Sequence, residues 1–167
     1  GYSRSDLGRW HIIALNSEVG TSPGSAQEVW LRADLAANTK QCTLAYWHKP
    51  RFSSGEHGND NVSQPLWQAL YEFNADVVVT GHDHNYERFA PQTATGVADP
   101  TRGLREFVVG TGGTDLRGVG TPIANSEVVN SDTHGVMKFT LRSNGYDWEF
   151  IPIAGKTFTD RGSGTCH

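Results

Sequence analysis

Apolar and polar residues alternate along the first two thirds of the chain in an order that predicts strands and helices. Four short apolar runs have the length and the β-branched or aromatic content of buried strands: residues 10–15, 42–47, 75–80 and 104–109. Two segments between them, residues 26–37 and 63–73, carry apolar residues at the spacing of a helix face. The order strand, helix, strand, helix, strand indicates a parallel or mixed sheet with helices packed against it.

Residues at the helix starts and near the C-terminus refine this picture. Ser25 precedes the first helix and Glu28 follows three residues later, which is the spacing of a capping box. Pro65 lies in the first turn of the second helix, where a missing N–H is tolerated. The last third of the chain alternates around Asn144-Gly145, a pair typical of a tight hairpin turn. We therefore expect an α/β fold, a mixed β-sheet system flanked by helices and ending in an antiparallel hairpin.

Length and composition exclude several classes of protein. A chain of 167 residues has the size of one domain, and five Trp, five Tyr and seven Phe are too many for a disordered segment. The formal net charge is −4 and Lys and Arg form no cluster, so nucleic-acid binding is not expected. No apolar run approaches the roughly 18 residues of a membrane span, and the first ten residues lack the apolar centre of a signal peptide. The sequence predicts a single domain over residues 1–167 with no membrane partner.

The chain has two cysteines, Cys42 at the front of an apolar run and Cys166 next to the last residue. Two thiols with no C-x-x-C spacing do not make a zinc site of the four-cysteine kind. We favour a Cys42–Cys166 disulfide, which places the protein in a secreted or otherwise extracytoplasmic compartment. The alternative is one buried free thiol and one exposed thiol.

Three histidines follow two of the predicted strands. His48 comes directly after residues 42–47, and His82 and His84 come after residues 75–80. These strands are expected to be neighbours, and sites in such sheets lie beyond the carboxyl ends of the strands. Neutral imidazole is the commonest metal ligand among side chains near neutral pH. One such histidine is usually an ordinary surface or core residue, but three together favour a metal site.

The same residues resemble two motifs of a known family. The segment Ala45 to His48 is similar to the V-x-x-H motif, and Gly81-His82-Asp83-His84 is similar to the G-H-x-H motif, of the calcineurin-like metallophosphoesterases. The sequence Tyr86-Glu87-Arg88 after the second motif resembles the purple acid phosphatase branch. The two motifs occur in the family's order, and the resemblance extends over about residues 8–117.

The resemblance implies roles for individual residues. His48 and His82 would bind one metal ion and His84 the other. In purple acid phosphatases a further histidine lies about nine positions after the V-x-x-H histidine, and His57 occupies that offset. It would bind the phosphate or protonate the leaving group, although a solvated loop histidine is an equally good reading.

This sequence departs from the family at its other metal motifs. The family's centre also uses a D-x-H or D-x-G motif, a Gly-Asp motif whose Asp bridges the ions, and a G-N-H motif. This chain has no Gly-Asp pair, and Asp60 follows Gly58-Asn59 where G-N-H has its histidine. In the family these motifs precede the first strand seen here. The resemblance thus implies that residues 1–167 correspond to the C-terminal half of a catalytic domain, with the N-terminal half of the same domain as partner.

The expected function is metal-dependent hydrolysis of a phosphoester, by a phosphatase or phosphodiesterase to which this chain contributes the histidine ligands of a dimetal site. The complete site would hold two ions such as Fe, Zn or Mn. Three imidazoles bring no negative charge to hold two cations side by side, so this chain alone is expected to bind at most one ion, weakly. Two alternatives stay open: a catalytically incomplete fragment, or a mononuclear module that binds zinc or copper without hydrolysis.

Other polar residues receive more ordinary interpretations. Asp83 lies between two candidate ligands and is expected to orient an imidazole or to cap the loop. Arg88 is expected to clamp an anion or to pair with a carboxylate such as Glu87. The loop at residues 110–114 lacks the Lys-Ser/Thr of a P-loop and is expected to be a strand-end turn lining the site. The remaining histidines outside these motifs are expected to be structural: His11, His134 and His167.

Overall fold

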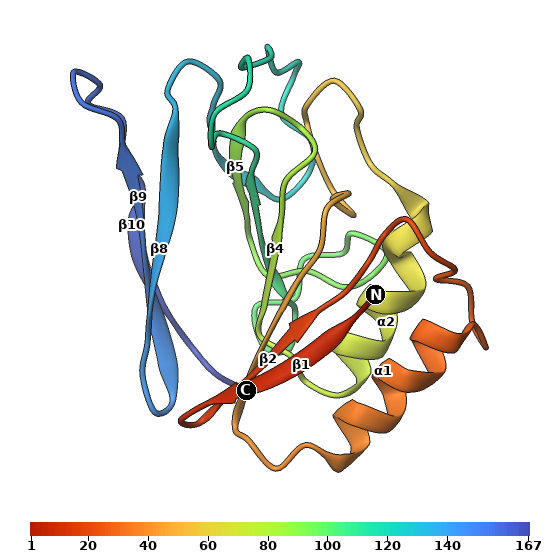
Figure 1. Cartoon of the computed structure of the whole chain (residues 1–167). Coiled ribbons are helices and arrows are strands. Elements are labelled where there is room, and N and C mark those ends of the chain that lie inside the picture. The colour runs from red at the N-terminus through yellow and green to blue at the C-terminus, as the bar shows by residue number, and fades with distance from the viewer.

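The structure, a computed structural model, describes residues 1–167 as two β-sheets and a pair of helices in three layers (Figure 1). The larger sheet has seven strands in the order β1-β2-β3-β4-β6-β5-β7. Their bounds are β1 Ser3–Leu7, β2 Trp10–Ala14, β3 Cys42–Tyr46, β4 Val77–Thr80, β5 Tyr86–Phe89, β6 Arg105–Val109 and β7 Ser126–Asn130. The smaller sheet has the order β10-β9-β8, with β8 Gly135–Leu141, β9 Gly145–Pro152 and β10 Arg161–Thr165.

The centre of the larger sheet is parallel. Strands β2, β3, β4 and β6 pair in parallel, whereas β1, β5 and β7 join antiparallel. The four apolar runs of the sequence form the four parallel strands, so the predicted mixed sheet is confirmed. Its registers place the carboxyl ends of β3 and β4 side by side, with Tyr46 opposite Val79.

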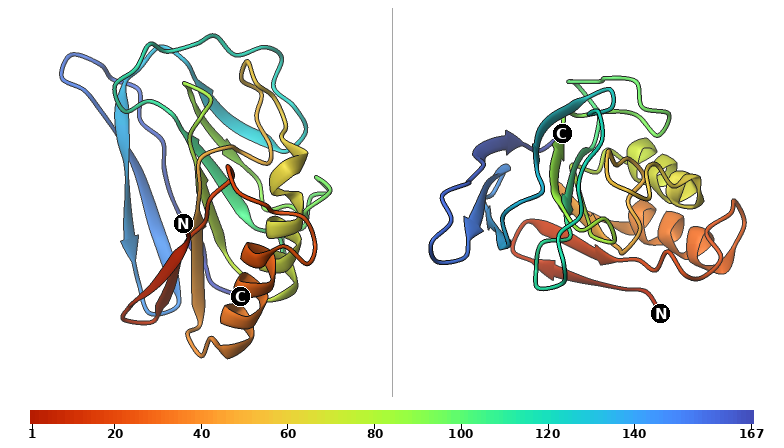
Figure 2. Two further views of the ribbon diagram at one scale, coloured as in Figure 1. Left: turned by 45° about the vertical axis from the view of Figure 1, so that its right-hand side comes forward. Right: turned by 90° about the horizontal axis from the view of Figure 1, so that it is seen from above.

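Both helices cover one face of the larger sheet, as the two views in Figure 2 make plain. Helix α1 runs Ala26–Ala37 and α2 runs Gln64–Glu72, after a 3-10 turn at Asn61–Ser63. The predicted cap of α1 is present, because the Ser25 side chain accepts a hydrogen bond from the Glu28 N–H. The helices and the sheet share one apolar core, which includes Leu31, Leu35, Leu66, Trp67, Leu70, Ile13, Ala45 and Val78. Neither helix has the length and apolar character that crossing a bilayer requires.

The smaller sheet packs on the opposite face of the larger sheet (Figure 1, left). Alternate side chains of β9 point inward, and Phe150 lies 4.9 Å from the ring of Tyr86 while Trp148 lies 5.4 Å from the ring of Phe107. This aromatic layer follows from the period-2 pattern of the strand. The expected antiparallel hairpin is β8–β9, and β10 extends it to three strands.

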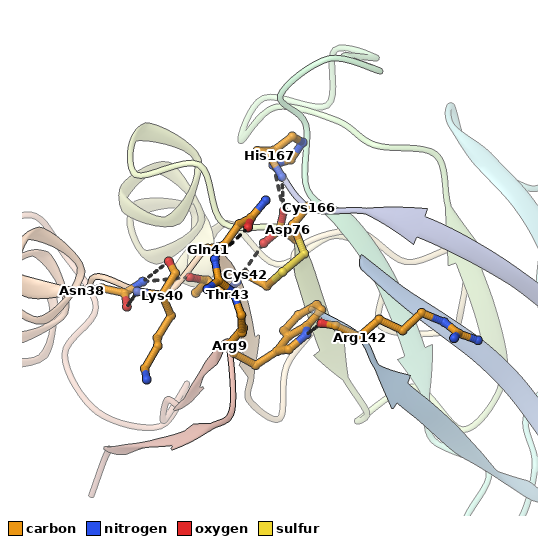
Figure 3. Close-up of a disulfide and its surroundings, with 11 residues drawn as sticks. Arg9, Asn38, Lys40, Gln41, Cys42, Thr43, Asp76, Arg142, Cys166 and His167 are labelled. Atoms are coloured by element: carbon orange, nitrogen blue, oxygen red, sulfur yellow. Dashed lines mark hydrogen bonds and ion pairs between the residues drawn. A yellow bond between two sulfur atoms is a disulfide. The ribbon is translucent and has the colours of Figure 1, made fainter. Parts of the chain in front are cut away.

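A disulfide joins the two sheets near the C-terminus (Figure 3). Cys42 at the start of β3 is bonded to Cys166 just after β10, so the cysteines are paired as predicted. Beside it, the buried Asp76 accepts hydrogen bonds from the Thr43 N–H at 2.7 Å and from the His167 N–H at 2.7 Å. The last residues are thereby fixed to the end of the larger sheet opposite the histidine-bearing ends.

Candidate metal centre

The first two motif histidines lie where β3 and β4 end. Beyond the last paired residues of these strands, the Trp47 N–H still donates to Val79 O at 3.2 Å, and the Gly81 N–H donates to His48 O at 3.0 Å. This extension of the parallel pairing holds the segment with His48 beside the segment with His82. The topology thus brings together residues 34 positions apart in the sequence.

The imidazoles of His48 and His82 are in direct contact. His48 Nε2 lies 2.9 Å from His82 Nδ1, and the ring centres are 4.7 Å apart. His82 has a φ of 57°, in the left-handed region that residues other than glycine rarely adopt. Burial lowers the pKa of His82, and the neighbouring imidazoles of His57 and His48 lower it further. A neutral imidazole, the form that binds metals, is therefore favoured at His82.

His84 contacts the loop that follows β6. Its Nδ1 lies 2.9 Å from the carbonyl oxygen of Asp115, and its own carbonyl accepts the Arg117 N–H at 3.0 Å. The start of the loop packs tightly against the same turn, because a Cβ on Gly110 would lie only 1.9 Å from Asp83 O. The loop that begins at Gly110 therefore lies against the histidine turn, as its place at the end of a predicted strand indicates.

His57 joins the group from a third segment. Its ring centre lies 4.0 Å from that of His82, and its Nδ1 lies 2.6 Å from Oδ1 of Asp83. Asp83 is 1% exposed and also accepts the His57 N–H at 3.0 Å and the Ser53 hydroxyl. Burial raises the pKa of Asp83, but these hydrogen bonds outweigh that effect and leave its pKa below the ordinary value. Asp83 therefore orients the imidazole of His57 as a buried carboxylate.

The ring nitrogens of His48 and His82 could provide two of the ligands that a metal ion needs. Two nitrogens on a tetrahedral zinc ion lie about 3.3 to 3.4 Å apart at a Zn–N bond length of about 2.0 to 2.1 Å. His48 Nε2 and His82 Nδ1 are hydrogen-bonded to each other at 2.9 Å, so they would separate by about half an ångström to bind one ion together. A set of three possible ligand atoms mutually within 4.8 Å occurs only at Cys42, Asp76 and Cys166, where the sulfurs are bonded to each other and cannot bind a metal. His48 and His82 are therefore close together, and no third side-chain ligand atom lies within the same reach of both.

Arg88 lies away from the histidines. Its side chain is between the two sheets, where Nε donates to Asp160 Oδ2 at 2.7 Å and Nη1 pairs with Glu127. The guanidinium carbon lies 5.1 Å from the Trp148 ring. Of the two expectations for Arg88, pairing with a carboxylate describes its position, although the carboxylates are Asp160 and Glu127. Glu87 instead faces the His57 loop and binds Ser54.

No motif marks two further residues, Arg117 beside His57 and Glu106 between Thr80 and the segment that follows His48. Arg117 places Nη1 3.4 Å from His57 Nε2, and it lies in a loop of no recognisable pattern. Glu106 in β6 is fully buried and accepts the Arg51 N–H at 3.2 Å and the Phe52 N–H at 3.1 Å. Burial raises the pKa of Glu106 to about 8. The one signal for it was an acidic residue inside a run predicted as a buried strand.

The other histidines lie apart from this group. His11 is buried between Asp6 at 2.8 Å and Asp34 at 2.6 Å, His134 contacts Thr114 O at 2.9 Å, and His167 pairs with Asp76 at 3.2 Å. A groove of about 590 Å³ opens between the two sheets beside His48. Eight of its thirteen lining residues are hydrophobic, among them Leu44, Val79 and Phe139.

Comparison with known proteins finds sequence similarity to purple acid phosphatases. No protein-family model matches the chain. Purple acid phosphatase 18 of Arabidopsis thaliana is 32% identical over 109 residues, which cover 62% of this chain and 24% of that protein. Purple acid phosphatase 21 of the same plant is 32% identical over 118 residues, which cover 67% of this chain and 26% of that protein. The chain spans about a quarter of the length of these relatives.

Solved structures share the architecture over nearly the whole chain. Purple acid phosphatase PPD1 from yellow lupin (Lupinus luteus) seeds superposes with a TM-score of 0.87 at 20% identity, covering 98% of this chain and 32% of that one. GAP50, the anchor in the inner membrane complex of Plasmodium, gives a TM-score of 0.72 at 15% identity, covering 99% and 53%. These likenesses show a shared fold, a mixed sheet with few helices and a final antiparallel three-stranded sheet.

The curated relatives narrow the class to one branch. The chain resembles the C-terminal region of purple acid phosphatases, and the resemblance drawn from the sequence motifs is confirmed. This similarity supports a metal-dependent phosphoesterase family and, with it, hydrolase chemistry.

Proposed function

We propose that residues 1–167 act as the C-terminal part of a metallophosphoesterase catalytic domain and supply the histidine ligands of its dimetal site. His48 and His82 would hold one ion and His84 the other. The observation that carries this proposal is the 2.9 Å contact between His48 Nε2 and His82 Nδ1, from the ends of two neighbouring parallel strands. In the structure the two rings are hydrogen-bonded to each other, and a small separation would let the two nitrogens bind one ion together.

The imidazole set needs a carboxylate to hold a second cation. Two-metal sites place their ions about 3.5 to 4 Å apart, and their repulsion calls for a bridging negative charge. We infer that the N-terminal half of the same domain brings this group. The apolar groove beside His48 supports the inference, because exposed apolar area next to a polar site marks a surface that another part of the protein covers.

Residues of this chain would also act on the substrate. Bound ions would supply charge stabilisation at the phosphoryl group of a phosphomonoester or phosphodiester. His57 would bind a phosphoryl oxygen through Nε2 or donate a proton to the leaving oxygen. Asp83 supports this role, because its carboxylate accepts the hydrogen bond from Nδ1 and leaves Nε2 to the substrate, to which Nε2 can donate when the ring carries a proton on both nitrogens. Nε2 then faces away from the buried carboxylate, toward Arg117.

We infer a secreted or otherwise extracytoplasmic location. The Cys42–Cys166 disulfide supports it, because structural disulfides persist in oxidising compartments and are rare in the reducing cytosol.

Calorimetric titration with Zn²⁺ tests the proposal on the chain itself. We expect one weakly bound ion, with binding abolished in His82→Ala and in His48→Ala. His134→Ala is the matched control, because it removes an imidazole outside the group and should leave the affinity unchanged. Zinc binding that survives both His48→Ala and His82→Ala would rule out this centre.

A second candidate function is a mononuclear metal-binding module. It is favoured by the small number of possible ligands. The ring nitrogens of His48 and His82 lie 2.9 Å apart, and no group of three possible ligand atoms includes a histidine. A phosphatase assay of the zinc-loaded chain separates the two, alone and after addition of a separately produced N-terminal half. Turnover that appears only with both parts supports the two-part catalytic domain, and binding without turnover in either case supports the module.

A further inference from the structure

A buried carboxylate lies beside the disulfide that joins Cys42 to Cys166 (Figure 3). The two sulfurs and a carboxylate oxygen of Asp76 all lie within 4.8 Å of one another. Cys42 is 0% exposed and Asp76 is 3% exposed, so both are withdrawn from solvent. Two sulfurs and one carboxylate oxygen are a ligand set that zinc accepts once the sulfurs are thiolates.

We propose that the chain with reduced cysteines binds one zinc ion through Cys42, Cys166 and Asp76, and that formation of the disulfide releases the ion. This inference is independent of the proposed function, because Cys42 begins β3 whereas His48 lies beyond the other end of that strand. The C-terminal segment would thus be held to β3 in both forms, by the ion in the reduced chain and by the S–S bond in the oxidised chain.

A small movement brings the three ligand atoms to zinc-binding distances. On a tetrahedral zinc ion with bonds of about 2.3 Å to sulfur and about 2.1 Å to oxygen, the ligand atoms lie about 3.6 to 3.8 Å apart. The carboxylate oxygen already lies within 4.8 Å of both sulfurs. The Cα atoms of the two cysteines are 5.4 Å apart, so rotation of the side chains separates the sulfurs once the S–S bond is broken. Water would fill the fourth position, as in zinc sites with three protein ligands.

Asp76 is already oriented as a metal ligand would be. Its Oδ2 accepts the Thr43 N–H at 2.7 Å, and its Oδ1 accepts the His167 N–H at 2.7 Å. His167 Nδ1 also lies 3.2 Å from Oδ1. A carboxylate has about four lone-pair sites, so these three contacts fix the group and leave a site for the ion. Carboxylates that bind metals are typically held by such outer hydrogen bonds.

A cavity reaches two of the three ligands. Its volume is about 310 Å³, and its lining includes Asp76, Cys166, His167 and Arg105. Two thiolates and a carboxylate around Zn²⁺ leave one net negative charge, which the guanidinium of Arg105 on the same wall would offset. Arg105 also pairs with Glu127 at 2.6 Å, so its guanidinium stays in place without the ion. The cavity therefore provides both space and compensating charge for the site.

The exchange between the two forms requires a two-electron reductant, for which we name a small dithiol. Its two thiols reduce the S–S bond to two cysteine thiols and become joined in a disulfide themselves. Zn²⁺ then replaces the proton on each cysteine thiol. In the reverse direction an oxidised dithiol takes two electrons from the thiolates, the S–S bond forms again and the ion leaves. A secreted chain is synthesised with reduced cysteines, so the zinc form would precede the disulfide form.

Cobalt(II) is the probe for this site, because zinc is d¹⁰ and spectroscopically silent, whereas a cobalt ion bound to thiolate sulfur absorbs by charge transfer. The 167-residue chain is reduced with dithiothreitol, freed of it by anaerobic gel filtration and titrated with Co²⁺. We expect thiolate-to-cobalt absorption that saturates at one ion and is removed by added Zn²⁺, and none in the oxidised chain. Loss of a ligand in Cys166→Ala or Asp76→Asn should weaken Co²⁺ binding by about 10- to 100-fold or more.

Asp34→Asn is the matched control, because it removes the same charge from a carboxylate that contacts His11. Equal losses in Asp76→Asn and Asp34→Asn would reduce the effect to net charge and overturn the proposal. Reduced chain without thiolate-to-cobalt absorption, or unchanged Co²⁺ affinity in Cys166→Ala, would overturn it as well. If circular dichroism shows that reduction unfolds the chain, Zn²⁺ should restore the fold, and failure to do so would contradict the proposal.

The double variant His48→Ala/His82→Ala separates this site from the proposed histidine centre. Its reduced form should keep the full thiolate-to-cobalt absorption, and loss of that absorption would overturn the proposal. Zinc binding by the oxidised chain reports on the histidines alone, so the failure of either site is distinguishable from the failure of the other.

Discussion

The ring of His57 is hydrogen-bonded to Asp83 at 2.6 Å, and the carboxylate at the other end of that bond is almost entirely buried. A loop histidine held in this way loses the freedom that an exposed imidazole normally has. The carboxylate also belongs to the residue between His82 and His84, so one turn after β4 carries two candidate ligands and orients a third imidazole.

Replacing Asp83 by asparagine should make the protein less sensitive to acid. The pKa of Asp83 is lowered in the folded chain, so its contribution to the free energy of unfolding is present above its unfolded value of 3.8 and is lost as the pH falls through the folded value. Asparagine has no such titration. Urea unfolding at neutral and acidic pH should therefore show Asp83→Asn less stable than the wild type by about 1 to 2 kcal/mol at neutral pH, and by less in acid. A constant difference at all pH values would contradict this account.

Glu106 should make the protein less stable as the pH rises. Burial raises its pKa to about 8 from 4.5, so the folded chain holds the proton more tightly than the unfolded chain. The resulting stabilisation is complete below about pH 4.5 and is lost as the pH rises through about 8. In Glu106→Gln the free energy of unfolding should fall less steeply over this interval. Identical slopes for the two proteins, measured by urea unfolding, would show that Glu106 does not titrate there.

Arg88 should matter for stability and not for metal binding. It is 12% exposed at the side chain and pairs with Asp160, which also accepts the Tyr86 hydroxyl at 2.6 Å and the Trp148 N–H at 3.1 Å. Removing one partner of a buried ion pair leaves the other charge uncompensated, so Arg88→Met should cost about 3 kcal/mol. Zinc titration should give the wild-type affinity. A variant of normal stability with weakened methyl phosphate binding would instead favour the anion-clamping role.

Reduction of the disulfide should loosen the smaller sheet. Cys42 and Cys166 are separated by 124 positions, and a loop of this length corresponds to about 4 to 5 kcal/mol in the chain-entropy description. Dithiothreitol should lower the urea midpoint and speed amide exchange in β10. The Cys42→Ala/Cys166→Ala double variant should already show both effects and respond no further to the reductant. A midpoint unaffected by reduction of the wild type would refute the prediction.

The parts of the fold that sequence pattern predicts are those in which burial and periodicity agree. Strands β2, β3, β4 and β6 come from the four runs predicted as strands. Helix α1 has the expected cap and buries Leu31 and Leu35, although Val29 is exposed. Strand β1 was missed because all five of its residues are exposed. Strand β5 was missed because it contains Glu87 and Arg88, whose buried charges find partners on distant segments. Strand β10, with Gly162 and Gly164, has no apolar pattern because the rings of Trp148 and Tyr146 fill the space beside it.

The candidate site likewise has a part that the sequence predicts and a part that it does not. His48 and His82 were predicted to be close because strand ends and motif spacing are local properties of the sequence. The position of Arg117 depends on how a loop without regular pairing crosses the β4 turn. The Arg117 N–H donates to His84 O, and further along the same loop the Ile123 N–H donates to the Ser54 hydroxyl. Contacts of this kind join segments far apart in the sequence, and no spacing rule anticipates them.

The absence of a side chain at position 110 has a consequence for engineering. Because a methyl group there would overlap the main chain of Asp83, even alanine would push the imidazole-bearing turn away from its neighbours. Randomised libraries aimed at new selectivity should therefore keep this glycine and vary Gly118 further along the same loop, where a Cβ would meet no atom within 4 Å.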